Sequence, residues 1–346
     1  MIVINARFLT QKITGVQRYA IEICNNIPNF INGHEVVYVS SKGVLLNKKL
    51  LLNKKIIQYG MFQGNIWEQI DLPFFLKKNE NPLLINFSGI APLFYKKKIF
   101  YLHDLIFKHS PETFSYFFQK AYNKLIPISA KYSLRLVCVS NHVKDDIKKY
   151  LKINNVDVVY AAQAPHFIDL NLKREKFILS VSSLDPRKNF KRVIEAYKKL
   201  DTDYKLIIVG SKSKSFSDIG LDDNMINDEI IFTGYIDDQE LVKLYNQASL
   251  FIFASLFEGF GIPPLEAQAC GCPCLLSNVA SLPEVYRDSV EYCDPYSIDS
   301  IKDKLNLLIN NEKRREELVE KGYKNIKRFS WQLSANKLKS IIESLS

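Results

Sequence analysis

The sequence predicts an α/β protein made of two doubly wound, parallel-sheet domains that face each other across a deep cleft. Two observations support this prediction. Short runs of apolar and β-branched residues alternate with segments of helical periodicity along the whole chain, which is the pattern of parallel sheets covered by helices. With 346 residues, 47% hydrophobic and 24% charged, the chain is long enough for two separate cores, and its composition excludes a disordered or fibrous protein.

Apolar runs predict the strands of the first half in order. Between the first two of these runs, Val16, Ala20, Ile23 and Ile27 recur at helical spacing and predict a helix. The predicted strands of this half are residues 1–5, 36–40, 83–87, 99–102, 136–139 and 156–159.

The second half repeats the alternation, with a helix predicted in several of the intervals between strands. The predicted strands are 177–181, 206–209, 230–232, 250–253 and 274–276. The helices predicted between them are 191–199, 239–248 and 264–269.

An interruption of the strand–helix alternation predicts the domain boundary. Gln, Pro, His and Asn interrupt the alternation near residues 162–173. We therefore expect a first domain at 1–165, a second at 172–330, and a final helix at 331–346 that returns to the first domain. Doubly wound sheets bind ligands at the carboxyl ends of their strands, so the site is expected there.

The sequence gives little support for a membrane-spanning, secreted or metal-binding protein. The longest apolar stretches, such as 250–256, are far shorter than the ~20 residues of a membrane-spanning helix. The amino terminus, MIVINARFLT, resembles a strand rather than a signal peptide, so we expect a cytoplasmic protein. The cysteines of Cys270-Gly-Cys272-Pro-Cys274 lack the CxxC spacing of zinc sites and suit the start of a buried strand.

The charge is unevenly distributed along the chain. Residues 1–170 hold 22 basic and 11 acidic residues, a net charge of +11, whereas residues 171–346 hold 25 and 26, a net charge of −1. All of the excess positive charge therefore lies in the first half. Lysine runs at 48–49, 54–55 and 96–98 contribute to it. Such a surface suits an anionic membrane or a phosphate-bearing acceptor, and we expect peripheral contact with the inner face of the plasma membrane. Nucleic acid is the alternative, but no recognisable RNA or DNA module accompanies the basic residues.

The most informative segment runs from Glu258 to Pro273, EGFGIPPLEAQACGCP. A strand ends just before it, glycines allow close approach of the backbone to a ligand, and Pro263-Pro264 suit a first helical turn. The start of that helix is expected to offer amides to a phosphate. Glu258 in the loop and Glu266 in the helix are then expected to accept hydrogen bonds from sugar or ribose hydroxyls, groups that a nucleotide sugar supplies together with phosphate.

Three further segments fall at strand ends. SSLDPRKN places Arg187 and Lys188 after the first strand of the second domain, where cations would neutralise a leaving diphosphate. His103-Asp104-Leu105 follows a strand of the first domain, and Gly15 begins the first helix in TGVQRY. Taken alone, His103 suits a core or surface histidine as well, and the Gly15 turn is not a dinucleotide fingerprint. Asp201-Thr202-Asp203 lies in a helix-to-strand turn, at the wrong end of a sheet for a metal-binding carboxylate pair.

In this order, the segments resemble the family 4 glycosyltransferases, which are retaining nucleotide-sugar enzymes with two facing Rossmann-like domains, the GT-B fold. Glu258 and Glu266 match the family's Glu-x7-Glu motif. FTGYIDDQELVKLY and SNVASLPEV resemble other blocks of the family, and the resemblance extends from Met1 to the Phe329-Ser330-Trp331 segment.

The resemblance implies a role for each matching position. The catalytic set would be Glu258 on the transferred sugar, Lys188 with Arg187 on the diphosphate, and His103 facing the sugar from the other domain. Glu266 would hold the ribose, and Ile236 would meet the base. Ser183 stands where many members have an arginine, so Arg187 is expected to replace that cation. The remaining expected donor contacts are Gly15, Gly259, Phe260 and Gly261.

The resemblance also suggests the reaction. It implies transfer of a mannose- or rhamnose-type hexosyl unit to a hydroxyl of a glycan or lipid-linked acceptor in surface polysaccharide or lipopolysaccharide synthesis. A GDP-sugar donor is favoured over a UDP-sugar, with no metal or other cofactor. A nucleotide-sugar epimerase of the same fold is the main alternative. A nicotinamide dehydrogenase is disfavoured because the first strand–helix turn lacks three glycines.

Overall fold

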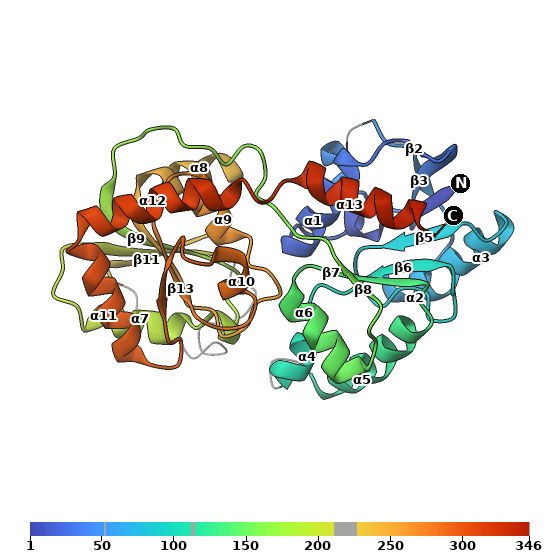
Figure 1. Ribbon diagram of the computed structural model, residues 1–346. Helices are drawn as coiled ribbons and strands as arrows, with labels where there is room; N and C mark the ends of the chain where they lie inside the picture. Colours follow the sequence, from blue (N-terminus) through green and yellow to red (C-terminus); the bar gives the residue numbers. More distant parts are fainter. Residues whose placement is uncertain (52, 112–114, 211–226, 346) are drawn as a thin grey trace. The chain divides into compact units, whose positions relative to one another are not determined.

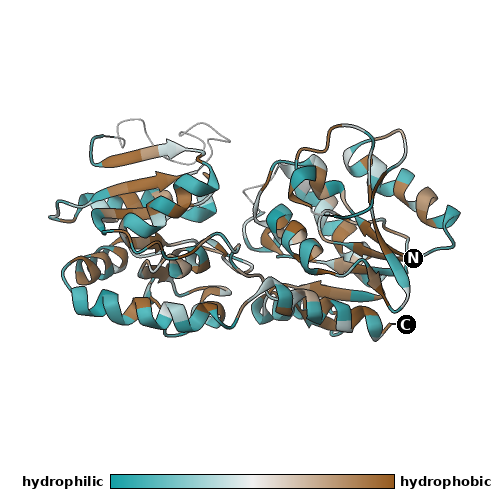
Figure 2. Ribbon diagram, turned by 90° about the horizontal axis from the view of Figure 1, so that it is seen from above, coloured by the Kyte–Doolittle hydropathy of each residue, from teal (hydrophilic) through white to brown (hydrophobic). Residues whose placement is uncertain are grey.

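The computed structural model describes residues 1–51, 53–111, 115–210 and 227–345, which form two compact units (Figure 1). Unit 1 comprises Met1–Ala161 with Trp331–Ser346, and unit 2 comprises Ala162–Ser330. Each unit is a largely parallel sheet with helices around it, so the predicted α/β class is confirmed. In Figure 2 the strands are mostly hydrophobic while the helices alternate between hydrophilic and hydrophobic residues, as expected of amphipathic helices covering buried sheets.

Unit 1 is built on one sheet of order β2-β3-β1-β5-β6-β7-β8, with β4 beside β3. All pairings are parallel except that of β2 with β3. The order reverses between β1 and β5, which makes this pair the switch point of the sheet. The strands are β1 (Ile2–Asn5), β2 (Phe30–Ile31), β3 (His34–Ser40), β4 (Ile56–Gln58), β5 (Leu83–Asn86), β6 (Lys98–Tyr101), β7 (Arg135–Cys138) and β8 (Val156–Val158).

The carboxyl-terminal helix belongs to unit 1. It packs beside α1, where the Tyr19 and Trp331 rings lie 5.4 Å apart edge to face, and the Ser334 hydroxyl donates to the Tyr160 carbonyl at 2.6 Å (Figure 1). The helices of the unit are α1 (Gly15–Asn26), α2 (Gly64–Gln69), α3 (Asp71–Lys78), α4 (Ile106–His109), α5 (Tyr116–Lys131), α6 (Asn141–Asp146) and α13 (Trp331–Glu343), with 3-10 turns at Arg7–Thr10 and Lys48–Leu50 and a π-helical turn at Ile147–Leu151.

Unit 2 is a six-stranded, wholly parallel sheet of order β11-β10-β9-β12-β13-β14, the doubly wound order, with its switch point between β9 and β12. The strands are β9 (Glu175–Val181), β10 (Lys205–Val209), β11 (Ile230–Gly234), β12 (Ala248–Phe253), β13 (Cys274–Ser277) and β14 (Glu291–Cys293). The helices are η5 (a 3-10 turn, Pro186–Lys188), α7 (Phe190–Lys198), α8 (Asp238–Gln247), α9 (Pro263–Ala269), α10 (Leu282–Tyr286), α11 (Ile298–Ile309) and α12 (Glu312–Ile326).

Every strand predicted from the sequence is present, with ends that differ by at most two residues, and the three helices predicted in the second half are present within one residue. Strands β2, β4 and β14, each two or three residues long, were not predicted. One expectation about the surface is wrong. Lys98, taken as part of an exposed lysine run, is fully buried, and its ammonium donates to the carbonyls of Pro92 and Leu93 at 2.7 and 3.2 Å. Among the described helices, none has the length and hydropathy needed to cross a membrane.

Candidate functional site

The candidate site of unit 2 lies at the switch point of its sheet. The segment after β9 turns into η5 and α7, and the segment after β12 turns into α9. Because β9 and β12 are neighbouring parallel strands, their carboxyl ends open at the same edge. The sequence-predicted residues Arg187, Lys188 and Glu258 are therefore brought to one place by topology.

The loop after β12 is held by backbone contacts that only certain residues allow. Gly261 has φ of +84°, and a Cβ there would lie 2.8 Å from the Leu282 side chain, so glycine is required. The Gly261 carbonyl accepts a hydrogen bond from the Tyr286 hydroxyl, and the Ser281 hydroxyl donates to the Glu258 carbonyl at 2.9 Å. These contacts fix the backbone that carries Glu258.

A second set of contacts fixes the cations. Asn189 lies buried in a left-handed conformation, and its side-chain amide donates to the carbonyls of Ala254 at 3.0 Å and Pro295 at 2.7 Å. The Leu256 amide donates to the Arg187 carbonyl at 2.8 Å. The 3-10 turn after β9 is thus tied to the end of β12, which places Lys188 against Glu258.

Lys188 and Glu258 form a buried ion pair. The Lys188 ammonium lies 2.5 Å from Glu258 Oε1, and the Arg187 guanidinium lies 3.9 Å from Oε2, with side-chain exposures of 9% for Lys188 and 10% for Glu258. The Lys188 ammonium also lies over the Phe253 ring, 5.3 Å from its centroid. The Glu258 carboxylate therefore faces two cations at the carboxyl ends of β9 and β12.

Burial is the largest influence on both partners and opposes the charge of each. For Glu258, the charges of Lys188 and Arg187 outweigh burial, and its pKa lies below the usual range of a glutamate. Burial lowers the pKa of Lys188, although the Glu258 carboxylate opposes that shift. At neutral pH the carboxylate is therefore ionised and holds the cations in the positions that an incoming anion would need.

Glu266 lies one turn into α9 and is bonded to a tyrosine, whereas Glu258 is paired with a lysine. Its buried carboxylate accepts a hydrogen bond from the Tyr245 hydroxyl of α8 at 3.1 Å. Burial and the adjacent carboxylate raise the pKa of Tyr245 well above its usual value, so this phenol stays a donor. Sequence reasoning missed Tyr245, since nothing in its pattern distinguishes it from a core aromatic.

The expected anion site at the start of α9 is not supported. Pro263 and Pro264 occupy the first two helical positions and have no N–H group, and the amides of Leu265 and Glu266 both donate to the Ile262 carbonyl at 2.8 and 3.3 Å. Any phosphate bound here would therefore be held by the cations after β9 and the loop after β12, rather than by this helix.

Other predicted positions of unit 2 lie at the same edge of the sheet. Ser183 is exposed in the turn after β9, and Ile236 is half-buried in the turn between β11 and α8. Gly259 and Phe260 are buried in the loop that follows Glu258, with the Phe260 ring packed edge to face on Phe329 at 5.6 Å.

In unit 1, His103 lines a cavity of about 180 Å³ at the carboxyl end of β6. The cavity has both polar and apolar walls. His103 Nε2 lies 2.7 Å from the Phe87 carbonyl, the Tyr19 ring packs edge to face on the imidazole at 5.0 Å, and burial lowers the pKa of His103. The imidazole is therefore neutral at pH 7 and donates to Phe87 through Nε2. The lining residues are Val16, Ser88, Gly89, Tyr101, Leu102, His103, Asp104, Ile106, Phe107, Tyr122 and Ile126.

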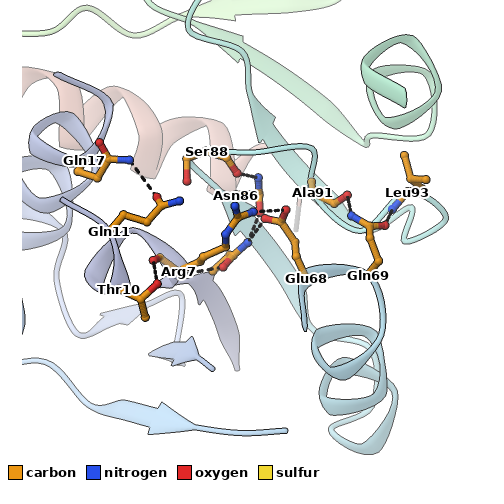
Figure 3. Close-up of polar contacts among 11 residues, drawn as sticks. Arg7, Thr10, Gln11, Gln17, Glu68, Gln69, Asn86, Ser88, Ala91 and Leu93 are labelled. Atoms are coloured by element: carbon orange, nitrogen blue, oxygen red, sulfur yellow. Dashed lines mark hydrogen bonds and ion pairs between the residues drawn. The ribbon is translucent and has the colours of Figure 1, made fainter. Parts of the chain in front are cut away.

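Gly15 begins α1, one residue before the cavity-lining Val16. The Gln17 side chain accepts from the Thr14 amide at 3.1 Å, which caps the helix. It also donates to the Gln11 side chain at 2.9 Å (Figure 3). A Cβ added at Gly15 would meet no atom within 4 Å, so the position opens on free space.

A buried polar network lies at the switch point of unit 1 and was not predicted. Arg7 Nη1 lies 2.9 Å from Glu68 Oε2, and the Asn5 side-chain amide donates to Glu68 Oε1 at 2.6 Å and also to Asn86 (Figure 3). Gly89 covers this pair, because a Cβ there would lie 2.9 Å from Glu68 Oε2 and 3.0 Å from Arg7 Nη1. These side chains come from three separate segments, 5–7, 68 and 86, with no shared motif, so the sequence alone does not indicate the network.

Among the described residues, neither the cysteines of 270–274 nor the Asp-Thr-Asp turn belongs to a cluster of metal-ligating side chains. Cys270, Cys272 and Cys274 are buried free thiols, and burial raises the pKa of each, that of Cys272 to about 12. Thiols that stay protonated are poor metal ligands. In the turn, the Asp203 carboxylate lies 2.5 Å from the Lys176 ammonium.

Residues 163–325 match the family described as glycosyl transferases group 1. This part of the chain belongs to that family. It contains Lys188, Glu258 and Glu266, whereas Gly15 and His103 lie outside it.

Curated relatives align with about half of the chain. A serotype-specific mannosyltransferase of Escherichia coli is 32% identical over 170 residues, which are 47% of this chain and 21% of the relative. O-antigen chain mannosyltransferase B of Escherichia coli is 32% identical over 169 residues, 45% of this chain and 42% of the relative. The chain thus spans less than half the length of these relatives.

Solved structures match the fold over almost the whole chain. Sucrose-phosphate synthase from Thermosynechococcus elongatus gives a TM-score of 0.78 at 15% identity, covering 99% of this chain and 98% of that one. Anabaena HepE in complex with UDP and glucose gives 0.76 at 14% identity, covering 99% of both chains. The chain therefore has the GT-B fold of nucleotide-sugar glycosyltransferases.

Proposed function

We propose that this protein is a retaining glycosyltransferase that moves a hexosyl unit from a nucleoside diphosphate sugar to a hydroxyl of a glycan or lipid-linked acceptor. One observation supports this most directly. A buried carboxylate, Glu258, is paired with Lys188 and faces Arg187 at the switch point of unit 2, within the segment that matches the family. A doubly wound sheet binds nucleotides at this point, and the chemistry of the donor requires both cations and hydroxyl acceptors.

Each residue has a distinct role in the proposed reaction. Lys188, with Arg187 in place of the cation missing at Ser183, neutralises the diphosphate, whose negative charge grows as the glycosidic bond breaks. Glu258 accepts hydrogen bonds from hydroxyls of the transferred sugar, with Gly259, Phe260 and Gly261 around it. Glu266, oriented by Tyr245, holds the ribose hydroxyls, and Ile236 meets the base.

The acceptor oxygen forms its bond to the anomeric carbon on the face from which the diphosphate leaves, so the configuration is retained. The bond from the anomeric carbon to the phosphate oxygen breaks, and the leaving phosphate takes the proton of the acceptor hydroxyl. No side chain becomes covalently attached. The neutral imidazole of His103 is proposed as a further contact of the transferred sugar, and Gly15 as a further contact of the phosphates.

The proposal extends to the donor sugar, the product glycan and the place in the cell where the reaction occurs. The mannosyltransferase names of the relatives favour a GDP-linked mannose-type sugar, and the UDP in the HepE complex makes a UDP-sugar the next choice. The O-antigen relative favours surface polysaccharide or lipopolysaccharide synthesis. The lysine-rich first half favours peripheral binding to the anionic inner face of the plasma membrane.

A ligand screen followed by a transfer assay tests the proposal. Thermal unfolding is measured with GDP, UDP, ADP and dTDP, with their sugars, and with NAD(H) as the control. A ligand at about 100 times its Kd stabilises the protein by about 2.7 kcal/mol, which is readily detected. We expect one nucleoside diphosphate to give that shift, and its sugar to yield a product of retained anomeric configuration by NMR.

Other outcomes overturn the proposal. A shift with NAD(H) alone would assign the site to a dehydrogenase. Interconversion of the sugar nucleotide without any acceptor would assign it to an epimerase. A product of inverted configuration would keep the transferase and reject the same-face reaction.

A further inference from the structure

A stripe of exposed apolar side chains runs along one side of unit 1. Ile66 of α2, Ile70 of the turn that follows and Phe74 of α3 are spaced four residues apart, and they are 57%, 41% and 64% exposed. The Ile70 amide donates to the Ile66 carbonyl at 3.0 Å and the Phe74 amide to the Ile70 carbonyl at 3.3 Å, so these three side chains lie on one side of a continuous helical segment. Phe62, which is 41% exposed, precedes α2. Met61 extends the stripe and is 85% exposed.

The same two helices are apolar on their inner face as well. Trp67, Leu72 and Phe75 pack with Val3 and Val37 in a core cluster of the sheet. An ordinary surface helix has polar residues on the side opposite its core face. This segment instead presents large apolar residues on both sides, which indicates that its outer face binds another surface.

No acid is exposed within α2, α3 or the turn before α2, and the exposed Glu80 lies two residues beyond α3. Residues 59–79, all of which the structure describes, contain two acidic residues, Glu68 and Asp71, and both are buried. Glu68 is paired with Arg7, and Asp71 Oδ2 accepts from the amides of Met61 and Phe62 at 2.9 and 2.8 Å. The exposed charges of the segment are those of Lys77 and Lys78.

A loop adds a further aromatic to this surface. The Gln69 side chain of α2 donates to the Ala91 carbonyl at 2.6 Å and accepts from the Leu93 amide at 3.0 Å (Figure 3). This clamp holds the loop against α2, and Phe94, the residue after Leu93, is 78% exposed.

Lysines continue beyond the loop. Lys96 and Lys97 are exposed, and the Lys96 ammonium lies 6.0 Å from the centroid of Tyr132, whose ring is 6.2 Å from Phe94. The surface therefore combines large apolar side chains with basic residues from two segments. The interfacial surface is defined as Met61, Phe62, Ile66, Ile70, Phe74 and Phe94 with Lys77, Lys78, Lys96 and Lys97.

We propose that this interfacial surface docks unit 1 on an anionic lipid bilayer, with the apolar side chains inserted at the headgroup boundary and the lysines on the lipid phosphates. Amphipathic segments with apolar and basic residues bind bilayers in this way, and charge complementarity selects the anionic lipid. The inference deepens the proposed function, because it names the surface that would bring the enzyme to a lipid-linked acceptor.

Vesicle partitioning without any nucleotide tests the docking. The full chain is mixed with vesicles of phosphatidylglycerol and phosphatidylcholine, or of phosphatidylcholine alone, and the bound fraction is measured by flotation. The variant Ile70→Ser/Phe74→Ser/Phe94→Ser removes three of the apolar anchors. The matched control, Phe30→Ser/Tyr296→Ser/Leu307→Ser, removes exposed apolar residues elsewhere.

We expect the wild type and the control to bind the anionic vesicles equally, and the stripe variant to bind at least about tenfold more weakly. Lys77→Ala with Lys78→Ala should weaken binding about fivefold per lysine at low salt. Near-UV circular dichroism verifies that the variants are folded. The readout needs no donor, so a failure of the proposed transferase activity leaves this result unaffected.

Two results overturn the docking proposal. Equal binding of the stripe variant and the control would show that the stripe does not insert. A wild type that sediments as a dimer, together with a monomeric stripe variant and no vesicle binding, would assign the surface to a second copy of the chain.

Discussion

The two units place a buried cation–carboxylate pair at the same point of their sheets. In unit 1, Arg7 and Glu68 lie beside the ends of β1 and β5, and in unit 2, Lys188 and Glu258 lie beside the ends of β9 and β12. Each position is the switch point of a doubly wound sheet. Only the pair in unit 2 lies in the segment that matches the glycosyl transferases group 1 family.

The chemistry of the two pairs is different. Glu68 receives hydrogen bonds from Asn5, Arg7 and the Ile90 backbone, and burial still raises its pKa. The pKa of Glu258 is lowered, because it faces two cations instead of one. A planar guanidinium in a network fixes a backbone, whereas a lysine ammonium on a flexible stem can move to a phosphate. The comparison suggests a scaffold in unit 1 and a binding site in unit 2.

The strongest test of this comparison removes the carboxylate of unit 2. Glu258→Gln should reduce sugar transfer more than about 100-fold, because the transferred sugar loses the acceptor that positions it and Lys188 loses its anion. Initial rates are measured with the donor that the ligand screen identifies.

Glu291→Gln is the matched control. Glu291 is also a partly buried carboxylate of unit 2 with two cations, Lys304 at 2.7 Å and Arg314 at 2.9 Å, but it begins β14 at the opposite edge of the sheet. Its variant should retain near-normal transfer. Equal activity of the two variants would mean that Glu258 has no special role in transfer.

The corresponding change in unit 1 should act on stability. Arg7→Gln leaves the fully buried Glu68 carboxylate without its cation, so the free energy of unfolding of unit 1 should fall by about 3 kcal/mol. Calorimetry measures it, and nucleotide binding should be unchanged in the folded protein. Glu35→Gln, which breaks the exposed pair with Lys55, should cost less than about 1 kcal/mol. An Arg7 variant as stable as the Glu35 variant would contradict the scaffold interpretation.

The same contrast explains what could be predicted from the sequence. The strands were predicted because buried parallel strands are continuous apolar runs. The site residues of unit 2 were predicted because they lie in contiguous motifs at strand ends; they are Glu258, Lys188 and Glu266. The Arg7–Glu68 network was not predicted, because its members come together only after the sheet has formed. The burial of Lys98 and the outward-facing apolar residues of α2 and α3 were missed for a related reason: which face of a short segment is buried depends on its neighbours.

The opposite pKa directions predict opposite effects of pH on stability. The folded-state pKa of Glu68 is raised, so its carboxyl reduces stability progressively as pH rises from the unfolded-state value through the folded-state one. The folded-state pKa of Glu258 is lowered, so its contribution is present above the unfolded-state value and is lost as pH falls through the folded-state one. From about pH 4 to pH 7, the wild type should lose stability relative to Glu68→Gln and gain it relative to Glu258→Gln. Urea unfolding measures both differences, and trends of the same sign would contradict the comparison.

The smallest expected effect concerns the residue that orients Glu266. Tyr245→Phe removes one hydroxyl that donates to the carboxylate at 3.1 Å and leaves the ring in place. A hydrogen bond of this kind contributes about 1 kcal/mol, so the affinity for the nucleoside diphosphate should fall about fivefold by calorimetric titration. Tyr197→Phe, which removes a hydroxyl bonded to the Tyr204 carbonyl at 2.6 Å, is the control and should leave the affinity unchanged. If Tyr245→Phe weakened a deoxyribose nucleotide as much as a ribose one, Glu266 would not be reading the 2′-hydroxyl, and the ribose contact would have to be sought on the 3′-hydroxyl alone.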